Sequence, residues 1–192
     1  MPDTTSIKTT LRRQLLADRH AIREEVRRAR DKAIGARVLA WWRANPAPML
    51  GVYWPIRGEP DLRQAYDELA SLGARLALPM VDRRDAPLRF AAWQPGDVLV
   101  NDAFGVPVPQ QAGAPVHPDA LLVPCVGFNA GHVRLGYGGG YYDRTLAVNP
   151  RPLAVGIAYA SSLAAFPCEP HDIPLDEVIT ESSPLAFAPL SL

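Results

Sequence analysis

Residues 134–144, which read RLGYGGGYYDR, concentrate the groups of this chain that could bind a phosphate. Four glycines fall within five positions, and arginines, an aspartate and three tyrosines surround them. Where such a loop leads into a helix, backbone N–H groups that no side chain covers can bind an anion, usually a phosphate. Glycine suits this loop because it lets a ligand approach closely and tolerates positive φ. The stretch therefore predicts an anion-binding loop.

The loop matches neither of the two common nucleotide-binding patterns. A P-loop requires Lys followed by Ser or Thr after the last glycine, where this chain has Tyr141 and Tyr142. The dinucleotide-binding pattern requires glycine or alanine at position 141 and an acidic residue at the end of a following strand. A tight turn without a ligand is the alternative interpretation of any lone glycine cluster. The charged and aromatic residues around this cluster favour a binding site.

Two apolar runs flank the loop and predict the elements that hold it. Residues 120–126 (ALLVPCV) and residues 153–159 (LAVGIAY) each have the composition of a buried strand. Between them, residues 142–147 can form a short helix that ends before Asn149 and Pro150. The predicted order is strand, glycine loop, helix, strand, which places the glycines at a helix N-terminus.

The remaining pattern indicates an α/β protein. Apolar runs predict strands at residues 49–54, 75–80, 88–93 and 178–180, and a helix at 62–72 that Asp61 caps and Gly73 ends. Residues 101–118 are rich in proline and small side chains, which predicts a long ordered loop. We expect a single domain spanning residues 1–192, with three layers and a mixed, mostly parallel sheet flanked by helices.

Residues 6–44 are helical in character and strongly basic. Apolar residues at helical spacing predict one continuous stripe, formed by Leu11, Leu15, Ile22, Val26, Ala29 and Ala33. Up to Ala44 the chain has eleven Lys and Arg against five Asp and Glu, a net charge of +6. The whole chain is neutral, so the remainder carries −6. A basic helical segment is compatible with RNA binding, but we favour a solvated face that the acidic remainder partly compensates.

Length and composition exclude several classes of protein. The 192 residues suffice for one domain with a substantial core, and the neutral net charge gives no general reason to expect nucleic acid or an acidic membrane as partner. Cys125 and Cys168 lack paired spacing, which is typical of reduced thiols in a cytoplasmic protein. The sequence shows no signal-peptide pattern and no apolar segment of membrane-spanning length. We expect a cytoplasmic monomer.

Residues 123–144, VPCVGFNAGHVRLGYGGGYYDR, closely resemble the signature of the 5-formyltetrahydrofolate cyclo-ligases, also called methenyltetrahydrofolate synthetases. The resemblance extends along nearly the whole chain in the family's order. It includes a Lys-x-x-x-Arg helix near the N-terminus, GEPD at 58–61, WQPG at 93–96, HD at 171–172 and DEVITE at 176–181. It implies ATP-dependent ring closure of 5-formyltetrahydrofolate to 5,10-methenyltetrahydrofolate, with release of ADP and phosphate.

The resemblance also implies where ATP binds. Lys8 and Arg12 are four residues apart and so face one side of a helix. Most such pairs are surface residues, but the matching pair of the family reaches the phosphates of ATP. Lys8, Arg134 and Arg144 would neutralise charge during phosphoryl transfer. The full implied ATP-binding set is Lys8, Arg12, Arg134, Gly136, Tyr137, Gly138, Gly139, Gly140, Tyr141, Tyr142 and Arg144.

A folate site and a metal site follow from the same resemblance. Glu59, by default a surface carboxylate, follows a predicted strand and matches the glutamate that binds the pterin. Trp54, Trp93, Tyr141 and Tyr142 complete the implied folate site, although Trp93 could equally belong to the core. Asp143 and Asp172 match aspartates that hold Mg²⁺, which favours one or two carboxylates with phosphate oxygens and water. Without the resemblance, Asp172 could be an isolated cap.

Other interpretations stay open, because fold alone does not fix function. A non-catalytic nucleotide- or RNA-binding protein could use the arginine-rich N-terminal segment, and a sugar-phosphate isomerase or acyl-CoA transferase could share the scaffold. The joint presence of Lys8, Glu59, Asp143 and Asp172 favours the ligase, with reduced folate and ATP as its partners and no nucleic acid or membrane. Val108 and Asn129 replace acidic residues that the family often has, and we assign them no role.

Overall fold

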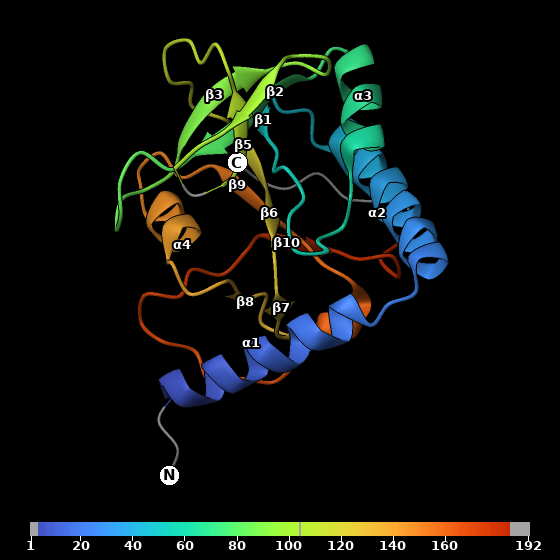
Figure 1. Cartoon of the computed structure of the whole chain (residues 1–192), viewed down its shortest axis with the longest axis vertical. Helices are drawn as coiled ribbons and strands as arrows, with labels where there is room; N and C mark the ends of the chain where they lie inside the picture. Colours follow the sequence, from blue (N-terminus) through green and yellow to red (C-terminus); the bar gives the residue numbers. More distant parts are fainter. Residues whose placement is uncertain (1–3, 104, 185–192) are drawn as a thin grey trace.

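A six-stranded sheet forms the centre of the molecule (Figure 1). The computed structural model describes residues 4–103 and 105–184. Its helices are α1 (Thr4–His20), α2 (Glu24–Ala44), α3 (Arg63–Ser71) and α4 (Tyr141–Leu146), with a 3₁₀ turn at Ala160–Ser162. Its strands are β1 (Met49–Gly51), β2 (Arg75–Met80), β3 (Arg89–Trp93), β4 (Leu99–Asn101), β5 (Pro107–Pro109), β6 (Ala120–Pro124), β7 (Gly127–Phe128), β8 (Arg134–Leu135), β9 (Leu153–Ile157) and β10 (Glu177–Ile179).

The strands of the main sheet run in the order β10-β9-β6-β1-β2-β3. All neighbours are parallel except β3, which pairs antiparallel with β2 and places Leu78 opposite Ala91. Strand β6 lies in the middle, with Leu121 opposite Ala154 of β9, and all five of its residues are buried. Central parallel strands are covered on both faces, which explains their unbroken apolar sequence. The predicted mixed, mostly parallel sheet is confirmed.

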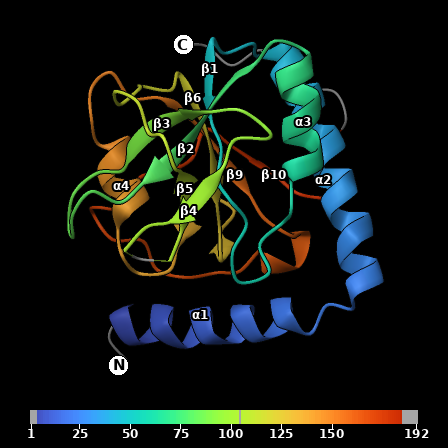
Figure 2. The same cartoon turned by 45° about the horizontal axis from the view of Figure 1, so that its top comes forward.

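Helices cover both faces of this sheet. Helices α2 and α3 pack side by side on one face, where Ile34, Val38 and Trp41 join a large buried cluster with side chains of β1, β6 and β9 (Figures 1 and 2). Helix α4 covers the opposite face, where Leu146 packs with Leu121 and neighbouring residues in a second cluster. These three layers agree with the architecture that the sequence predicts.

Helix α1 lies apart from both layers, at the bottom of both views (Figures 1 and 2). Leu15 packs with Val126, Val133, Leu135 and Phe166 in a third cluster, which joins α1 to the β7–β8 hairpin. The chain bends between α1 and α2, so the predicted continuous stripe is wrong. The second half of the predicted stripe does not form the buried face of α2. Ala29, which belongs to the stripe, is exposed, and the buried residues of α2 include Asp31, Ile34, Val38 and Trp41.

Most predicted element bounds differ from the observed ones by one or two residues, and three differences are larger. Strand β1 ends at Gly51 instead of residue 54, and the predicted loop at 101–118 contains β5, which pairs with β4. The two prolines of β5 are tolerated because the β4–β5 pair has free edges. The β7–β8 hairpin, inserted between β6 and the glycine loop, was not predicted, since strands of two residues carry no readable periodicity.

The two departures from the family pattern have structural roles. Val108 is buried in β5, opposite Val100 of β4. The Asn129 side-chain oxygen accepts the backbone N–H groups of Gly131 and Val133, both at 3.0 Å, and so closes the β7–β8 turn. An amide serves this purpose as well as a carboxylate, because both present an acceptor oxygen.

The features that bear on cellular context are few. Cys125 is buried, Cys168 is exposed, and both are free thiols, as their spacing predicts. Within residues 4–103 and 105–184, no helix combines the length and the hydropathy that crossing a bilayer requires.

The contact between α1 and the β7–β8 hairpin can be tested with Leu15→Ala. Truncating this buried leucine should lower the free energy of unfolding by about 2–5 kcal/mol, because it leaves a cavity. Urea denaturation measures the change. Leu72→Ala is the matched control, since Leu72 is half exposed at the end of α3 and should cost within about 0.5 kcal/mol. Equal losses for the two variants would contradict the docking of α1 through Leu15.

Candidate active site

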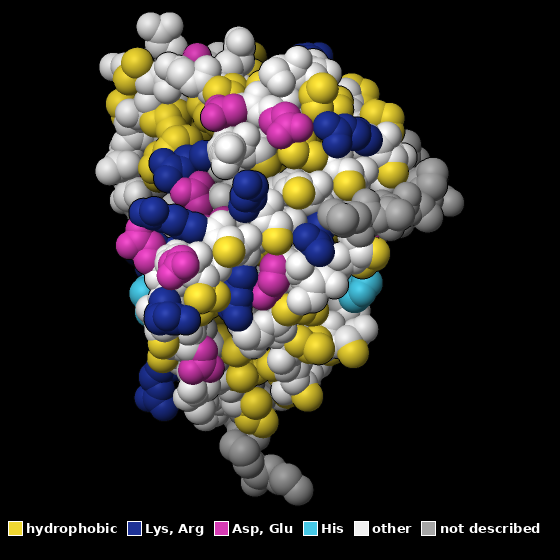
Figure 3. Space-filling model, turned by 90° about the vertical axis from the view of Figure 1, so that its right-hand side faces the viewer, with side chains coloured by type: hydrophobic (Ala, Val, Ile, Leu, Met, Phe, Trp, Pro, Cys, Tyr) yellow, Lys and Arg dark blue, Asp and Glu magenta, His cyan; other side chains and the backbone are white. Residues whose placement is uncertain are grey.

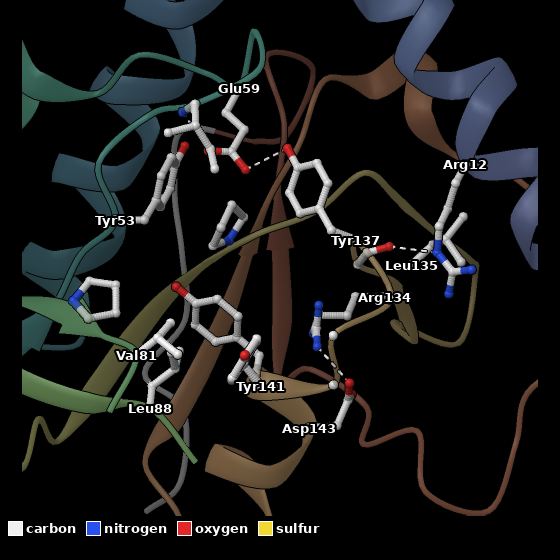
Figure 4. Close-up of a pocket in the computed structure, with 18 of the residues that line it drawn as sticks. Arg12, Tyr53, Glu59, Val81, Leu88, Arg134, Leu135, Tyr137, Tyr141 and Asp143 are labelled. Carbon is white, nitrogen blue, oxygen red and sulfur yellow. Dashed lines mark hydrogen bonds and ion pairs between the residues drawn. The ribbon is translucent and has the colours of Figure 1, made fainter. Parts of the chain in front are cut away.

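A pocket of about 400 Å³ opens between several segments that are far apart in the sequence (Figure 4). Helix α1 contributes two cations, the segment after β1 contributes Glu59 and its neighbours, and a third side comes from the loop before β10. All ten residues from 134 to 143 line another side. The volume is typical of a site for small molecules. The pocket therefore gathers most of the residues that the sequence singles out.

One wall of the pocket is apolar. Pro79, Val81, Leu88 and Val106 form it, and the rings of Tyr53 and Trp54 extend it. Trp54 is partly exposed and packs edge-on against Trp93, with ring centroids 6.0 Å apart. A wall of this kind suits a flat ring system, while the polar groups opposite would fix its orientation.

The glycine loop has the backbone that its sequence predicts. Gly138 has φ +95° and Gly140 has φ +65°, values that L side chains rarely adopt. Gly140 immediately precedes α4, so the loop leads into the start of a short helix. The Arg12 side chain donates from Nε to the carbonyl of Gly136 at 2.8 Å, which ties α1 to this loop. The loop is thus stabilised by a contact from α1 as well as by its own backbone conformation.

Lys8 is buried, with only 4% of its surface exposed. Its Nζ lies 2.6 Å from a carboxylate oxygen of Glu169 and 2.6 Å from one of Asp172. Burial lowers the pKa of Lys8, but the hydrogen bonds and charges of the two carboxylates outweigh burial and raise it. Both neighbours thus favour the ammonium form. Lys8 thus differs from most lysines in such helix pairs, which are surface residues, because the chain folds the loop before β10 over it.

The carboxylate of Asp172 is held in its ionised form by the same contact. Burial raises its pKa, but hydrogen bonds from Lys8 and from the backbone N–H of Glu169 outweigh burial, so the pKa lies below 3.8. Glu169, His171 and Asp172 present possible metal-ligand atoms within 4.8 Å of one another. Asp143, the other predicted metal ligand, is not one of these three.

Arg134 and Asp143 form a second ion pair in the pocket. Arg134 Nη2 lies 2.7 Å from Asp143 Oδ2, and the guanidinium also lies over the ring of Tyr142, 5.3 Å from its centre. Arg134 is buried on β8, and Asp143 belongs to the first turn of α4. The pair therefore links the two ends of the glycine loop, as the dashed contact in Figure 4 shows.

Glu59 is buried on another side of the same pocket. One oxygen accepts the backbone N–H of Ile56 at 2.9 Å, and the other accepts the hydroxyl of Tyr137 at 2.7 Å. Burial raises the pKa of Glu59, although these two hydrogen bonds and the charges of Arg19 and Arg57 oppose the rise. Glu59 is thus a desolvated acid at the edge of a cavity, which is a setting typical of functional groups.

Two predicted site residues do not lie in the pocket. Trp93 is 5% exposed, belongs to the large cluster under α2 and α3, and packs against Tyr66 as well as Trp54. Its place is in the core. Arg144 does not line the pocket; it donates to the carbonyls of Gly139 and Ala86, at 2.6 and 3.2 Å, and lies over the ring of Tyr141. Arg144 thus supports the glycine loop from behind.

The structure adds residues that the sequence analysis missed. Glu169 joins Lys8, and Arg57 lies over the ring of Tyr137, 5.2 Å from its centre. Arg19 is 2% exposed and donates to the Tyr137 hydroxyl at 3.1 Å. Its position, seven residues after Arg12, is a signal that could have been used, because i and i+7 share a helix face. The contact of Glu169 with Lys8 joins residues that are 161 positions apart, and no local sequence pattern indicates it.

Comparisons with known protein families and with known sequences all point to one family. The sequence profile of the 5-formyltetrahydrofolate cyclo-ligase family matches residues 4–181. A 5-formyltetrahydrofolate cyclo-ligase of Mycolicibacterium smegmatis is 34% identical over 188 residues, covering 90% of this chain and 93% of the relative. The enzyme of the same name from Escherichia coli (strain K12) is 30% identical over 172 residues, covering 85% and 94%.

Two solved structures have a similar fold. A 5,10-methenyltetrahydrofolate synthetase from Mycoplasma pneumoniae superposes with a TM-score of 0.76 at 26% identity, covering 91% of this chain and 99% of the other. The 5,10-methenyltetrahydrofolate synthetase of Aquifex aeolicus gives 0.74 at 31% identity, covering 92% and 91%. Both comparisons cover more than nine-tenths of this chain.

The buried position of Lys8 predicts a cost for removing it. Lys8→Met should lower the free energy of unfolding by about 1–3 kcal/mol, because it leaves the Asp172 side chain, only 10% exposed, without its cation. The loss should shrink in acid, since the pair contributes above the ordinary pKa of 3.8 and its contribution disappears as pH falls through the lowered pKa of Asp172.

Urea denaturation at neutral and acid pH measures both effects. Lys32→Met is the matched control, because Lys32 is exposed on α2 and is the only other lysine of the chain. If Lys8→Met were as harmless as Lys32→Met at neutral pH, the ion pair would contribute nothing to stability.

Proposed function

The chain belongs to the 5-formyltetrahydrofolate cyclo-ligase family, and on that premise we propose that it converts 5-formyltetrahydrofolate and ATP into 5,10-methenyltetrahydrofolate, ADP and phosphate. One observation supports this activity above all others. A single pocket holds an acid suited to a pterin ring, Glu59, together with three cations suited to phosphates, Lys8, Arg12 and Arg134. Both substrates can therefore meet in one cavity.

The chemistry explains why ATP is needed. The formyl oxygen is a poor leaving group, so it first attacks the γ-phosphorus of ATP, and ADP departs. N10 of the folate then attacks the activated formyl carbon and loses its proton. The bond between that carbon and the oxygen breaks, and the oxygen leaves as part of inorganic phosphate. Such transfer depends on alignment and on neutralisation of charge, and it requires no nucleophile from the protein.

The proposed ATP site is the glycine loop with the cations beside it. Backbone N–H groups of residues 136–140, including that of Tyr137, would hold the phosphates, with the rings of Tyr141 and Tyr142 beside them. Lys8, Arg12 and Arg134 would neutralise the transferred phosphoryl group. Arg144 would act indirectly, because its contacts with Gly139 and Ala86 stabilise the loop.

Magnesium is the proposed companion of ATP. Carboxylates line the pocket at Asp143 and Asp172, and carboxylate oxygens are the donors that this ion accepts. Asp143 is paired with Arg134, and Asp172 is paired with Lys8. Phosphate oxygens of a bound nucleotide could bind these two cations in place of the carboxylates. The donor set therefore fits Mg²⁺ bound together with a nucleotide. When bound, the ion would supply positive charge to the phosphate oxygens.

The proposed folate site lies around Glu59. Its carboxylate would accept N–H groups from the edge of the pterin, since an ionised acceptor makes the stronger hydrogen bond. Trp54 and the apolar wall of Pro79, Val81 and Leu88 would cover the faces of the ring. Tyr141 and Tyr142 lie where the glycine loop meets this wall and would contact both substrates.

The alternatives receive no comparable support. An RNA-binding protein would need a continuous basic surface, whereas the face over α2 and α3 shows Lys and Arg interspersed with Asp and Glu (Figure 3). The isomerase and transferase alternatives rest on the scaffold alone. We propose that residues 1–192 act as a single domain, a cytoplasmic monomer whose partners are the reduced folate and ATP.

The proposed activity predicts a coloured product. Purified protein mixed with 5-formyltetrahydrofolate and MgATP should produce the methenyl chromophore, and no product should form when ATP is left out. EDTA in excess should stop the reaction, and added Mg²⁺ should restore it, because the carboxylates and the phosphates need a shared cation. A rate that EDTA leaves unchanged would remove magnesium from the proposal, and a silent complete mixture would remove the activity.

The two halves of the pocket predict opposite effects for two conservative variants. Glu59→Gln keeps the size of the side chain and removes its charge, so folate affinity should fall roughly ten- to a hundredfold, or about 1.5–3 kcal/mol. Its fold should survive, because burial already disfavours the charge. Asp143→Asn should weaken MgATP binding and spare folate.

Separate titrations of each variant with 5-formyltetrahydrofolate and with MgATP distinguish the two effects. Asp67→Asn is the control for loss of an acidic charge, since Asp67 is exposed on α3. The half-sites would be assigned wrongly if Glu59→Gln weakened MgATP binding while leaving folate affinity intact.

A further inference from the structure

A buried arginine, Arg19, is connected to Glu59 by two hydrogen bonds that share the hydroxyl of Tyr137. Arg19 of α1 donates from Nη1 to the Tyr137 hydroxyl at 3.1 Å, and that hydroxyl donates to Glu59 Oε1 at 2.7 Å. The other end of the arginine fork, Nη2, donates to the carbonyl of Cys125, just beyond β6. The three side chains thus form one line from the end of the central strand to the pocket.

The fixed geometry of this line is its main property. Arg19 is 2% exposed and Glu59 is 4% exposed, so neither side chain can reorient into water. The hydroxyl of Tyr137 is both acceptor from Arg19 and donor to Glu59, which leaves it one orientation. Figure 4 shows the phenol pointing away from Arg134 and Asp143 and toward Glu59. Tyr137 belongs to the glycine loop by sequence, but its side chain serves the opposite half of the pocket.

We propose that Arg19 and Tyr137 are positioning residues for the ring-closing reaction, which keep the Glu59 carboxylate ionised and aimed at the pterin edge of the folate. The inference rests on the proposed function, because it takes Glu59 as the folate acceptor. Neither side chain touches the reacting formyl group or the γ-phosphate in this assignment. Both side chains act only through Glu59.

The electrostatics explain why such support is needed. A carboxyl group this deeply buried tends to protonate, and a protonated Glu59 would lose the charge that makes it a strong acceptor. Burial raises the pKa of Glu59, and the Ile56 N–H, the Tyr137 hydroxyl, Arg19 and Arg57 all act against that rise. Arg57 is exposed and screened by water, so the buried Arg19 is the more effective of the two cations.

The other titratable groups that face Glu59 stay neutral over the relevant range. They are Tyr53 after β1, Tyr66 of α3, Cys125 after β6, Tyr137 itself and Tyr142 of α4. Burial raises the pKa of Cys125 to about 11 and raises those of the four tyrosines. A pH-dependent loss of folate affinity between neutral and mildly acid pH that disappears in Glu59→Gln would therefore report Glu59.

The test measures the affinity for 5-formyltetrahydrofolate by calorimetry across buffers from neutral to acid pH. In the wild-type protein, affinity should hold above the raised pKa of Glu59 and fall as pH drops through it. Tyr137→Phe should shift this midpoint to higher pH and weaken binding at neutral pH about tenfold, because the carboxylate loses a donor. Arg19→Lys should shift it in the same direction, and Arg19→Met further.

Three comparisons make the outcome decisive. Arg13→Met removes an exposed guanidinium from the same helix and should leave the profile unchanged. Glu59→Gln should flatten the profile, since the titrating group is gone. MgATP affinity should stay within about twofold, or about 0.4 kcal/mol, in every Tyr137 and Arg19 variant, because both side chains act through Glu59.

The proposal fails if wild-type protein shows the folate midpoint and Tyr137→Phe leaves it in place. It also fails if Tyr137→Phe weakens folate and MgATP equally at every pH, which is what a merely structural loss would do. Should the Arg19 variants not fold, Tyr137→Phe still decides, because it removes one oxygen and keeps the ring. Wild-type protein that does not bind 5-formyltetrahydrofolate at all would overturn the proposed function first, and this inference with it.

Discussion

The constraint on which this structure depends is that its buried charges must be paired. Lys8 lies between Glu169 and Asp172, Arg134 lies against Asp143, and Arg19 is linked through Tyr137 to Glu59. An unpaired charge in such positions would cost several kcal/mol, so each pair fixes the place of the segments that supply it. Buried pairs contribute modestly to net stability, because desolvation offsets their attraction. Their larger effect is to specify one arrangement of the chain around the pocket.

Helix α1 shows what this specification achieves. It belongs to neither helical layer, and its apolar contact is the small cluster around Leu15. Its polar side chains reach the glycine loop, the end of β6 and the loop before β10. The helix therefore joins three segments that the sheet alone would leave separate. Lys8 and Arg19 belong to the same helix. Phosphate oxygens that bound Lys8 in place of its carboxylates would therefore contact the helix that also supports Glu59, through Arg19 and Tyr137.

The sequence predicts the sheet better than it predicts the site. Long apolar runs predicted strands correctly, because burial on both faces imposes a local pattern; the run at 120–126 forms β6, which ends two residues earlier, at Pro124. The resemblance to the family indicated Lys8, Glu59 and the glycine loop, all of which line the pocket. It could not place Trp93 or Arg144, whose neighbours come from elsewhere in the chain. Burial of Lys8 likewise follows from residues more than 160 positions away.

In the proposed assignment, the glycine loop is what lets one pocket serve two unlike substrates. Its glycines at 138 and 140 expose backbone on the side where phosphates would lie, and Tyr137, beside them, sends its side chain to Glu59. Backbone and side chain of one short segment thus address opposite halves of the cavity. A loop displacement large enough to disturb the phosphate site would also move the donor of Glu59. In the proposed assignment, the distance between the γ-phosphate and the formyl oxygen would therefore be set within a single turn, and alignment of this kind is what phosphoryl transfer requires.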